Sequence, residues 1–558
     1  MSRSTWLAAV LVLSACQPAQ QKVEPGKASF DWFEYTGRDL WFEQPAGPDS
    51  IHNPILAGFY PDPSIVRVDD AYYLVTSSFA WYPGVPIFRS TDLVHWTQIG
   101  HVLDRPSLLP LEGLGVSRGV FAPTIRYHDG LFYMITTLVE AGGNFFVTAS
   151  DPARPWSEPV WLPEVDGIDP SLFFDDDGRV YVVNNGPPDY EPLYEGHRAL
   201  WIQEIDLAAG KMIGPRKVIV DGGVDLATQP IWIEGPHLFR VNGWYYLIAA
   251  EGGTEFYHSQ VVFRSRAPFG PYEPGPVNPI LTQRTLEPER PFPVIATGHA
   301  DLVQTQQGDW WAVFLGCRPY EEILYNTGRE TFLHPVTWTD GWPLILDPDR
   351  AVPLALQAPD LPQGQPAPTP HTGNFTWRDE FDGDELALAW NSLRGPPDAW
   401  LDLDSNPGSA ILKAGIERLT GSSTPAFLAR RQQHASFSAS TSMQLPEQPG
   451  ISAGLAAFQN ERHHFYLGVR RAGDEWSIFL ERAAGEDPSL LAERALDPGE
   501  SDRIELRIEA DGRPYTFSYR LGSGDWVPLA EDIDGSFLST EVAKGFVGSY
   551  IGVHARRE

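Results

Sequence analysis

One pattern of apolar and polar positions occurs five times in the first two thirds of the chain. Each copy opens with an acidic or small residue, usually followed by proline, and continues as an apolar stretch, a polar turn and an aromatic stretch. The copies are DPSIVRVDDAYYLVTSS, APTIRYHDGLFYMITTL, DPSLFFDDDGRVYVVNN, EGPHLFRVNGWYYLIAA and GHADLVQTQQGDWWAVFLG. Valine, isoleucine and aromatic residues between turn residues are typical of β-strands, so each copy predicts two strands.

The turn inside each copy indicates that its two strands form a hairpin, because Asp-Gly and Asn-Gly are preferred in two-residue hairpin turns. The turns are Asp69-Asp70, Asp129-Gly130, Asp177-Gly178, Asn242-Gly243 and Gly308-Asp309. Five hairpins followed by further strand-like segments predict an all-β fold, a five-bladed β-propeller over residues 50–357. The first strand of each propeller blade lines the central channel, so the openings of the five copies should meet at one mouth.

A different pattern follows the proline-rich segment APDLPQGQPAPTPHTGN, which predicts an extended, semi-rigid linker over residues 358–373. From residue 374 to 558, segments such as FSASTSMQL, GISAGLAAFQ and HHFYLGVRR alternate apolar and polar positions. Alternation with one apolar face predicts an antiparallel β-sandwich as an accessory domain. No long helix is expected.

The N-terminus has the features of an export signal. MSRSTWLAAVLVLSAC combines Arg3 with an apolar run that is too short to span a bilayer. LSAC resembles the signal of bacterial lipoproteins, whose cysteine, here Cys16, becomes the lipidated first residue; an ordinary signal peptide that contains a cysteine is the alternative. We expect a signal peptide at 1–15, a tether at 16–49, and an exported lipoprotein held at a membrane, periplasmic or outer, only by its lipid.

Charge and cysteine content restrict the partners. The 558 residues include 73 Asp and Glu against 41 Lys and Arg, a formal net charge of −32. Such a field repels phosphate backbones, which disfavours nucleic acid as a partner and suits a neutral substrate. The second cysteine, Cys317, lies in the apolar segment WWAVFLGCRP and is expected to be a buried thiol. The sequence leaves the oligomeric state open.

Three of the five copies open on a carboxylate, namely Asp62, Asp169 and Glu234. One acid would be explained by a turn, but three at equivalent repeat positions, converging on one mouth, indicate a shared site. Prolines on both sides of Asp62 place it at the rigid start of a strand. Carboxyls near aromatic residues indicate glycoside hydrolysis, in which one protonates the leaving oxygen and another activates water or attacks the sugar.

Six ordered motifs carry a more specific resemblance: NPILAGFYPDPSI, GIDPSLFFDDDG, IEGPHLF, AEGGT, TGHADLVQT and NTGRETF. They resemble glycoside hydrolase family 43, its β-xylosidase branch in particular, and the C-terminal part is similar to the concanavalin-like sandwich of that branch. The resemblance implies that Asp62 is the general base, that Glu234 is the general acid, and that Asp169 orients the acid and raises its pKa. The substrate-binding residues would be Phe79, Phe121, Thr254, His299 and Arg329. No cofactor would be required, although calcium near His299 is an option within the family.

One position departs from that branch, because Phe121 stands where xylosidases of this type commonly carry tryptophan. A smaller ring covers less of the sugar and donates no N–H. We predict an exo-acting, inverting β-xylosidase that releases xylose from the non-reducing ends of β-1,4-xylo-oligosaccharides or arabinoxylan fragments. The alternative is an α-L-arabinofuranosidase or a bifunctional enzyme, and a non-catalytic glycan-binding lipoprotein is disfavoured by the three acids. The sandwich either binds glycan or lends a loop that closes the pocket, and the resemblance favours the loop.

Overall fold

The computed structural model describes residues 26–44, 47, 50–485, 487–497, 499 and 501–558. The predicted signal peptide and Cys16 lie outside these residues. Apart from the four-residue helix α1 (Thr540–Ala543), the helices of the described chain are short 3-10 turns: η1 (Leu40–Glu43), η2 (Pro106–Leu108), η3 (Leu226–Thr228), η4 (Pro397–Ala399) and η5 (Gly535–Leu538). Within the described ranges, no helix has the length and apolar character needed to cross a membrane.

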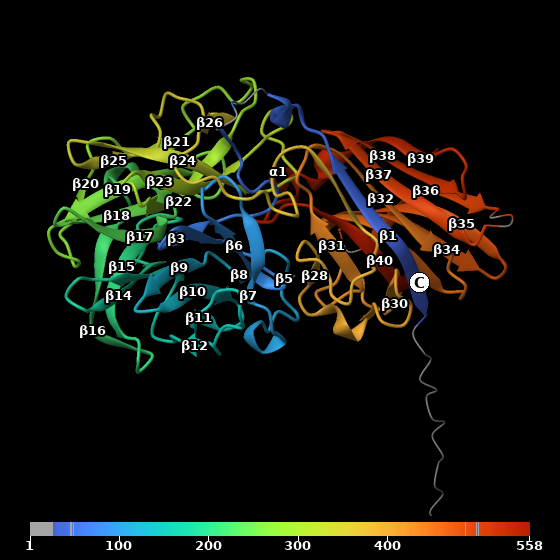
Figure 1. Ribbon diagram of the computed structural model, residues 1–558, viewed down its shortest axis with the longest axis horizontal. Coiled ribbons are helices and arrows are strands. Elements are labelled where there is room, and N and C mark those ends of the chain that lie inside the picture. The colour runs from blue at the N-terminus through green and yellow to red at the C-terminus, as the bar shows by residue number, and fades with distance from the viewer. Residues whose placement is uncertain (1–25, 45–46, 48–49, 486, 498, 500) are drawn as a thin grey trace, which may run out of the picture.

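Five antiparallel sheets form the blades of a propeller, which confirms the predicted fold (Figure 1). Blade 1 contains β3 (Ser64–Val68), β4 (Ala71–Val75), β6 (Gly84–Ser90) and β7 (Thr97–Leu103). Blade 2 contains β9 (Thr124–His128), β10 (Leu131–Val139), β11 (Gly143–Ala149) and β12 (Val160–Trp161), with β8 (Gly119–Val120) beside β10. Blade 3 contains β13 (Ile168–Phe174), β14 (Val180–Gly186), β15 (Ala199–Asp206) and β16 (Lys211–Asp221).

The last two blades follow the same order. Blade 4 contains β17 (Glu234–Val241), β18 (Trp244–Glu251), β19 (Ser259–Ser265) and β20 (Glu273–Pro274), with β21 (Leu281–Thr282) beside β19. Blade 5 contains β22 (Ile295–Gln304), β23 (Trp310–Cys317), β24 (Glu330–Thr339) and β25 (Trp342–Leu344). Cys317 is fully buried in β23, as expected, and is a free thiol.

The predicted hairpin turns connect the first two strands of each blade. In blades 2 and 4, Asp129 and Gly130, and likewise Asn242 and Gly243, have positive φ at both turn positions. That pairing matches the right-handed twist of the adjoining strands, which explains why Asp-Gly and Asn-Gly stand there.

A separate apolar core fills each gap between neighbouring blades, and the core between blades 5 and 1 closes the ring. There Val303 and Trp311 of blade 5 pack with Ile65, Tyr72 and Leu74 of blade 1. Full burial of each such side chain contributes about 1.5–3 kcal/mol. The ends of the propeller segment are also joined, because β2 (Ser50–His52) pairs with β26 (Ala355–Gln357).

The C-terminal part is the predicted β-sandwich, made of two eight-stranded sheets. One contains, in order, β29 (Leu401–Asp402), β30 (Ala410–Lys413), β1 (Lys27–Gly37), β32 (Ser436–Gln444), β37 (Arg503–Asp511), β38 (Pro514–Leu521) and β39 (Val527–Asp534), with β27 (Phe375–Asp379) beside β1. The other contains β36 (Pro488–Leu496), β35 (Glu475–Ala484), β34 (His463–Ala472), β33 (Ile451–Asn460), β40 (Tyr550–Arg557), β31 (Phe427–Arg431), β28 (Asn391–Leu393) and β5 (Trp81–Tyr82).

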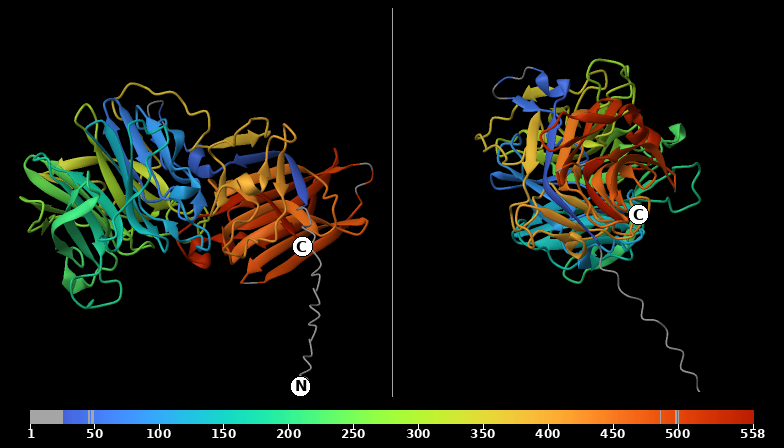
Figure 2. Two further views of the ribbon diagram at one scale, coloured as in Figure 1. Left: turned by 90° about the horizontal axis from the view of Figure 1, so that it is seen from below. Right: turned by 90° about the vertical axis from the view of Figure 1, so that its right-hand side faces the viewer.

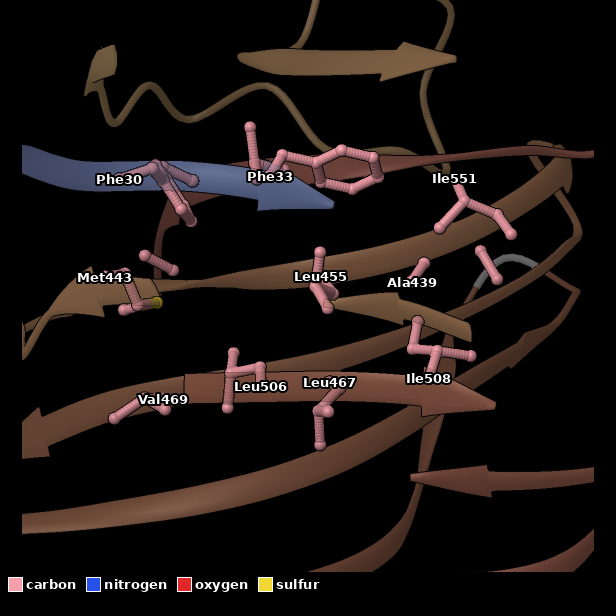
Figure 3. Close-up of a cluster of buried hydrophobic side chains, with 14 of the residues drawn as sticks. Phe30, Phe33, Ala439, Met443, Leu455, Leu467, Val469, Leu506, Ile508 and Ile551 are labelled. Carbon is pink, nitrogen blue, oxygen red and sulfur yellow. The ribbon is translucent and has the colours of Figure 1, made fainter. Parts of the chain in front are cut away.

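The position of β1 corrects the expected tether at 16–49. Residues 27–37 form a central strand of the first sandwich sheet, paired with β27, β30 and β32. Phe30 of β1 points into the sandwich core beside Met443, and Phe33 beside Leu455 (Figure 3); both phenylalanines are fully buried. The physical reason is the apolar face of KASFDWFEYTG, which a tether would leave in water.

Propeller and sandwich lie side by side and share a core (Figure 2). Strand β5 of the propeller segment pairs with β28 of the sandwich, and the Trp81 ring stacks on Tyr550 with centroids 3.6 Å apart. The linker at 358–373 is also fixed on the propeller, because the backbone carbonyl of His371 accepts a hydrogen bond of 2.8 Å from the Ala57 backbone N–H. The expected semi-rigid spacer is therefore a packed segment, and the sandwich lies within reach of the propeller mouth.

Candidate active site

A cavity of about 520 Å³ lies at the mouth where the inner strands begin. The three predicted acids, Asp62, Asp169 and Glu234, all line it. The five predicted substrate-binding residues line it too, namely Phe79, Phe121, Thr254, His299 and Arg329. The structure thus gathers every site residue that the sequence indicated within the described part of the chain.

An unusual backbone conformation starts four of the inner strands. Asp62, Asp169, Gly235 and His299 have φ between 51° and 55°, the left-handed region. Such a conformation is costly for residues with a side chain and is kept where the surrounding structure imposes it, as at functional sites. The strand register shifts at these points in β13, β17 and β22, which turns the opening side chains toward the cavity.

Glu234 differs from the expectation that the three acids occupy equivalent positions. Asp62 and Asp169 directly precede a proline, but in the fourth copy that position is Gly235, and Glu234 stands one residue earlier. A side chain is excluded at Gly235, because a Cβ there would lie 2.6 Å from Nε2 of His299. The acidic side chain of blade 4 therefore comes from Glu234, the residue before Gly235.

Asp62 is held in its ionised form. Arg329 Nη1 donates a hydrogen bond of 2.7 Å to Asp62 Oδ1, the Ser77 hydroxyl donates to Oδ2, and His299 Nδ1 lies 3.6 Å from Oδ1. Burial would raise the pKa of Asp62, but Arg329, His299 and Ser77 outweigh burial and lower it below its ordinary value. Near neutral pH this carboxylate is a charged acceptor.

The pKa values of Glu234 and Asp169 are shifted in the opposite direction to that of Asp62. Burial, together with the negative charges of Asp169 and Asp62, raises the pKa of Glu234 well above its ordinary value. Burial also raises the pKa of Asp169, to about 6, although His299 and the backbone N–H of Gly235, which donates to Asp169 Oδ2 at 3.2 Å, favour the charged form. One cavity thus contains a proton acceptor at Asp62 and a proton donor at Glu234.

Phenylalanines form an apolar wall beside Asp62. Phe79 lies 5.0 Å from Phe121 and 6.1 Å from Phe546, between ring centroids. Phe546 belongs to the sandwich, in the segment between α1 and β40, and its carbonyl accepts a hydrogen bond of 3.4 Å from Arg329 Nη2. The sandwich therefore contributes directly to the cavity, as the expected loop would.

Sequence reasoning missed several lining residues. Phe546 had no local signal, since its place depends on domain packing. Trp232 could have been found, because it stands two residues before Glu234 in the segment IWIEG and also lines the cavity. Arg118 and Arg198 line the cavity as well and stand in no motif.

A calcium ion near His299 would need oxygen ligands, and Asp62 supplies the carboxylate beside the imidazole, with Oδ1 3.6 Å from Nδ1. Ca²⁺ takes about six to eight oxygen ligands. The described residues contain no group of three or more His, Cys, Asp or Glu side chains placed to hold a metal ion. The oxygens of Asp62, the acid nearest His299, already accept hydrogen bonds from Arg329 and Ser77.

A propeller mouth in which the pKa of one carboxyl is lowered and that of another is raised is the arrangement that an acid–base glycoside hydrolase requires. The chain belongs to glycosyl hydrolases family 43: that family matches residues 51–343, and the "Beta xylosidase C-terminal Concanavalin A-like domain" matches residues 378–558. The predicted family is confirmed.

Related proteins match nearly the whole chain. "Xylosidase/arabinosidase" of Butyrivibrio fibrisolvens is 42% identical over 509 residues, which cover 90% of this chain and 95% of that protein. "Non-reducing end alpha-L-arabinofuranosidase" of Bacteroides ovatus is 38% identical over 519 residues, which cover 91% of each chain. A crystal structure of a GH43_12 protein retrieved from a capybara gut metagenome has a TM-score of 0.88 at 39% identity, covering 96% of this chain and 100% of that one.

Proposed function

We propose that the protein is an exo-acting, inverting glycoside hydrolase that releases xylose from the non-reducing ends of β-1,4-xylo-oligosaccharides. Asp62 acts as general base on the attacking water, and Glu234 acts as general acid on the leaving oxygen. Asp169 raises the pKa of Glu234 and thereby keeps it protonated. The single observation that carries this proposal is the opposite bias of the Asp62 and Glu234 pKa values inside one cavity.

The surroundings of each carboxyl support these roles. A base must be ionised before it can take a proton from water, and Arg329 and Ser77 stabilise that form of Asp62. An acid must hold its proton until the bond breaks, and burial beside Asp169 stabilises that form of Glu234. The wall of Phe79, Phe121 and Phe546 excludes water from one side and favours a terminal sugar unit, which supports exo action.

The test is hydrolysis by the purified protein. Release of xylose from xylobiose, lost in Asp62→Ala and strongly reduced in Glu234→Ala, is the expected result. Binding of xylobiose without any release of sugar would overturn the proposal and support a non-catalytic glycan-binding protein instead.

A second candidate is α-L-arabinofuranosidase, alone or as a second activity. Two relatives, one a xylosidase/arabinosidase and one an arabinofuranosidase, support this second candidate. Phe121 leaves the preferred sugar open, because its ring covers less of a sugar than the tryptophan common in the xylosidase branch. The ratio of kcat/KM on nitrophenyl β-D-xyloside and nitrophenyl α-L-arabinofuranoside decides between the two sugars.

We also propose that the enzyme is exported and anchored by lipid at Cys16. LSAC carries this part of the proposal, and Gln17 after the cysteine favours an outer membrane. Stable anchoring needs more than one acyl chain. Cys16→Ser should move the enzyme from the membrane fraction to the soluble fraction with turnover unchanged, and equal partition of both forms would overturn the anchor.

No cofactor enters the proposed reaction. Acid, base and sugar-binding groups are all supplied by side chains, so extensive dialysis against a calcium chelator should leave kcat/KM on xylobiose unchanged. A loss that added Ca²⁺ restores would instead support the calcium site near His299.

A further inference from the structure

The side of the cavity that receives the leaving group follows from the position of the general acid. Glu234 protonates the oxygen that departs, so the sugar on the far side of that bond lies next to Glu234 and away from Asp62. Glu234 begins β17 of blade 4, and the wall next to it is formed by blades 3 and 4, including Pro187, Arg198 and Trp232.

Trp232 is fixed in place on this wall. Its φ of 52° takes it out of the strand conformation two residues before Glu234. Its backbone N–H donates a hydrogen bond of 2.8 Å to the Gly196 carbonyl, and the preceding carbonyl, of Ile231, accepts one of 2.9 Å from Gly252. The Trp232 side chain lines the cavity and is partly exposed. An indole fixed by its backbone offers a flat apolar surface at little entropic cost.

Arg198 packs against the same indole ring. Its Cζ lies 4.2 Å from the centroid of the Trp232 ring, a cation–π contact. Burial lowers the pKa of Arg198 against the opposing effect of Glu234, but a guanidinium stays charged. On the opposite wall, Arg118 donates to Glu140 at 2.7 Å. The guanidinium of Arg198, by contrast, makes no hydrogen bond or ion pair with any residue that the structure describes, so its N–H groups are free to bind a ligand.

We propose that Trp232 and Arg198 form the subsite for the leaving sugar. The indole stacks on one face of that sugar ring, and the guanidinium of Arg198 donates hydrogen bonds to its hydroxyls. This inference rests on the proposed function, because Glu234 as general acid sets the direction of the substrate. With this subsite, kcat/KM depends on the sugar unit next to the terminal pentose as well as on the terminal pentose itself.

The test compares two substrates that share the terminal sugar and differ in the leaving group. Xylobiose places a sugar ring in the subsite, whereas methyl β-D-xyloside places only a methyl group there. Trp232→Ala should lower kcat/KM on xylobiose about 10- to 100-fold more than on methyl β-D-xyloside, since an aromatic contact of this size is lost. Trp232→Phe should recover most of the difference.

A matched control is Trp244→Ala. Trp244 also makes a cation–π contact, with Arg266 Cζ 3.4 Å from the centroid of its ring. It follows the hairpin turn after β17, at the end of that strand opposite Glu234, and it does not line the cavity. It should leave the ratio of the two kcat/KM values as in the wild type. If Trp232→Ala fails to fold, Arg198→Gln serves instead, with the same shift of the ratio expected.

The outcomes separate this inference from the proposed function. A wild type that releases sugar from neither substrate, nor from the matching arabinofuranosides, overturns the proposed function and the subsite together. A wild type that cleaves both substrates, with variants that lose activity on both equally, overturns only the subsite. If arabinofuranose is the preferred terminal sugar, methyl α-L-arabinofuranoside and arabinofuranosyl-xylobiose replace the two xylosides and are judged in the same way.

Discussion

Arg329 donates a hydrogen bond of 2.7 Å to Asp62, and the two side chains are 7% and 5% exposed. The pair joins the last blade of the propeller to the first, because Arg329 directly precedes β24 and Asp62 lies just before β3. The same guanidinium lies 5.7 Å from the Phe79 ring and reaches the carbonyl of Phe546 in the sandwich. One arginine therefore contacts the catalytic carboxylate, the apolar wall and the sandwich at once.

Replacing Arg329 should change the acidic limb of the pH profile. Arg329 lowers the pKa of Asp62, and Arg329→Met removes that effect while burial remains. The base then protonates at higher pH, so the acidic limb of kcat/KM should move upward, with a loss of about 100-fold at its optimum from misplacement of the base. Arg329→Lys should recover only part, since an ammonium lacks the fork of the guanidinium. An unchanged acidic limb would show that Asp62 is not the base.

Varying the leaving group separates the acid from the base. A nitrophenolate departs without a proton, so Glu234→Ala should lose about 10²–10⁴-fold on xylobiose and far less on a nitrophenyl xyloside. Asp62→Ala removes the group that activates water and should harm both substrates alike. Equal losses of Glu234→Ala on the two substrates would remove the general-acid role from Glu234.

The propeller could be predicted because each blade repeats one pattern, and each hairpin turn in it is specified by residues that are adjacent in the sequence. Asn242-Gly243 specifies a hairpin without reference to the rest of the chain, and five such hairpins specify the ring. Strand β1 was missed for the opposite reason. Phe30 and Phe33 show that KASFDWFEYTG needs a core, but nothing nearby indicates that its partners are β32, some 400 residues away, and β27.

Those site residues that open a copy of the repeat could be predicted from the sequence. Asp62 and Asp169 precede prolines at matching places, so their convergence followed from the fold. The offset of Glu234 depends on the ring of His299 approaching Gly235, and the wall at Phe546 depends on how two domains pack. Contacts of this kind are set by tertiary structure, and no local pattern carries them.

Asp169 should control the alkaline limb of the pH profile. Its negative charge raises the pKa of Glu234, so Asp169→Asn should lower that pKa. The acid then loses its proton at lower pH, and the alkaline limb of kcat/KM should move downward. A pH series on xylobiose measures the shift, and the same series on a nitrophenyl xyloside, which needs no acid, is the control. An alkaline limb that stays in place would assign Asp169 an orienting role alone.

Asp301, on strand β22 of blade 5, should be essential for stability. It is fully buried, accepts from Arg126 at 2.9 Å and from the Ser64 hydroxyl at 2.6 Å, and so joins blades 1, 2 and 5. Asp301→Ala leaves Arg126 without its carboxylate partner and should cost about 3–5 kcal/mol in the free energy of unfolding.

The pH dependence of that cost checks its origin. Burial opposes ionisation of Asp301, but Arg126 and His237 outweigh it and lower the pKa of Asp301. A lowered folded-state pKa gives stability that is present above the unfolded-state pKa and is lost as pH falls through the folded-state value. The difference in unfolding free energy between wild type and Asp301→Asn should therefore shrink in acid. A difference that does not depend on pH would point to packing instead.

The stereochemistry of the product tests whether Asp62 activates water or attacks the sugar. Inversion needs room for a water, with the two carboxyls about 6.5–9.5 Å apart instead of the roughly 5–5.5 Å of a retaining pair. Asp62 and Glu234 come from blades 1 and 4, which are not neighbours, and His299 of blade 5 lies between Asp62 and Gly235. Arg329 and Ser77 hold the Asp62 oxygens in place, so the carboxylate is positioned to polarise a water opposite the leaving group.

We expect α-xylose as the first product from a β-linked substrate, observed by proton NMR before mutarotation. Release of β-xylose, or capture of a covalent sugar on Asp62, would make Asp62 a nucleophile and the enzyme a retaining one.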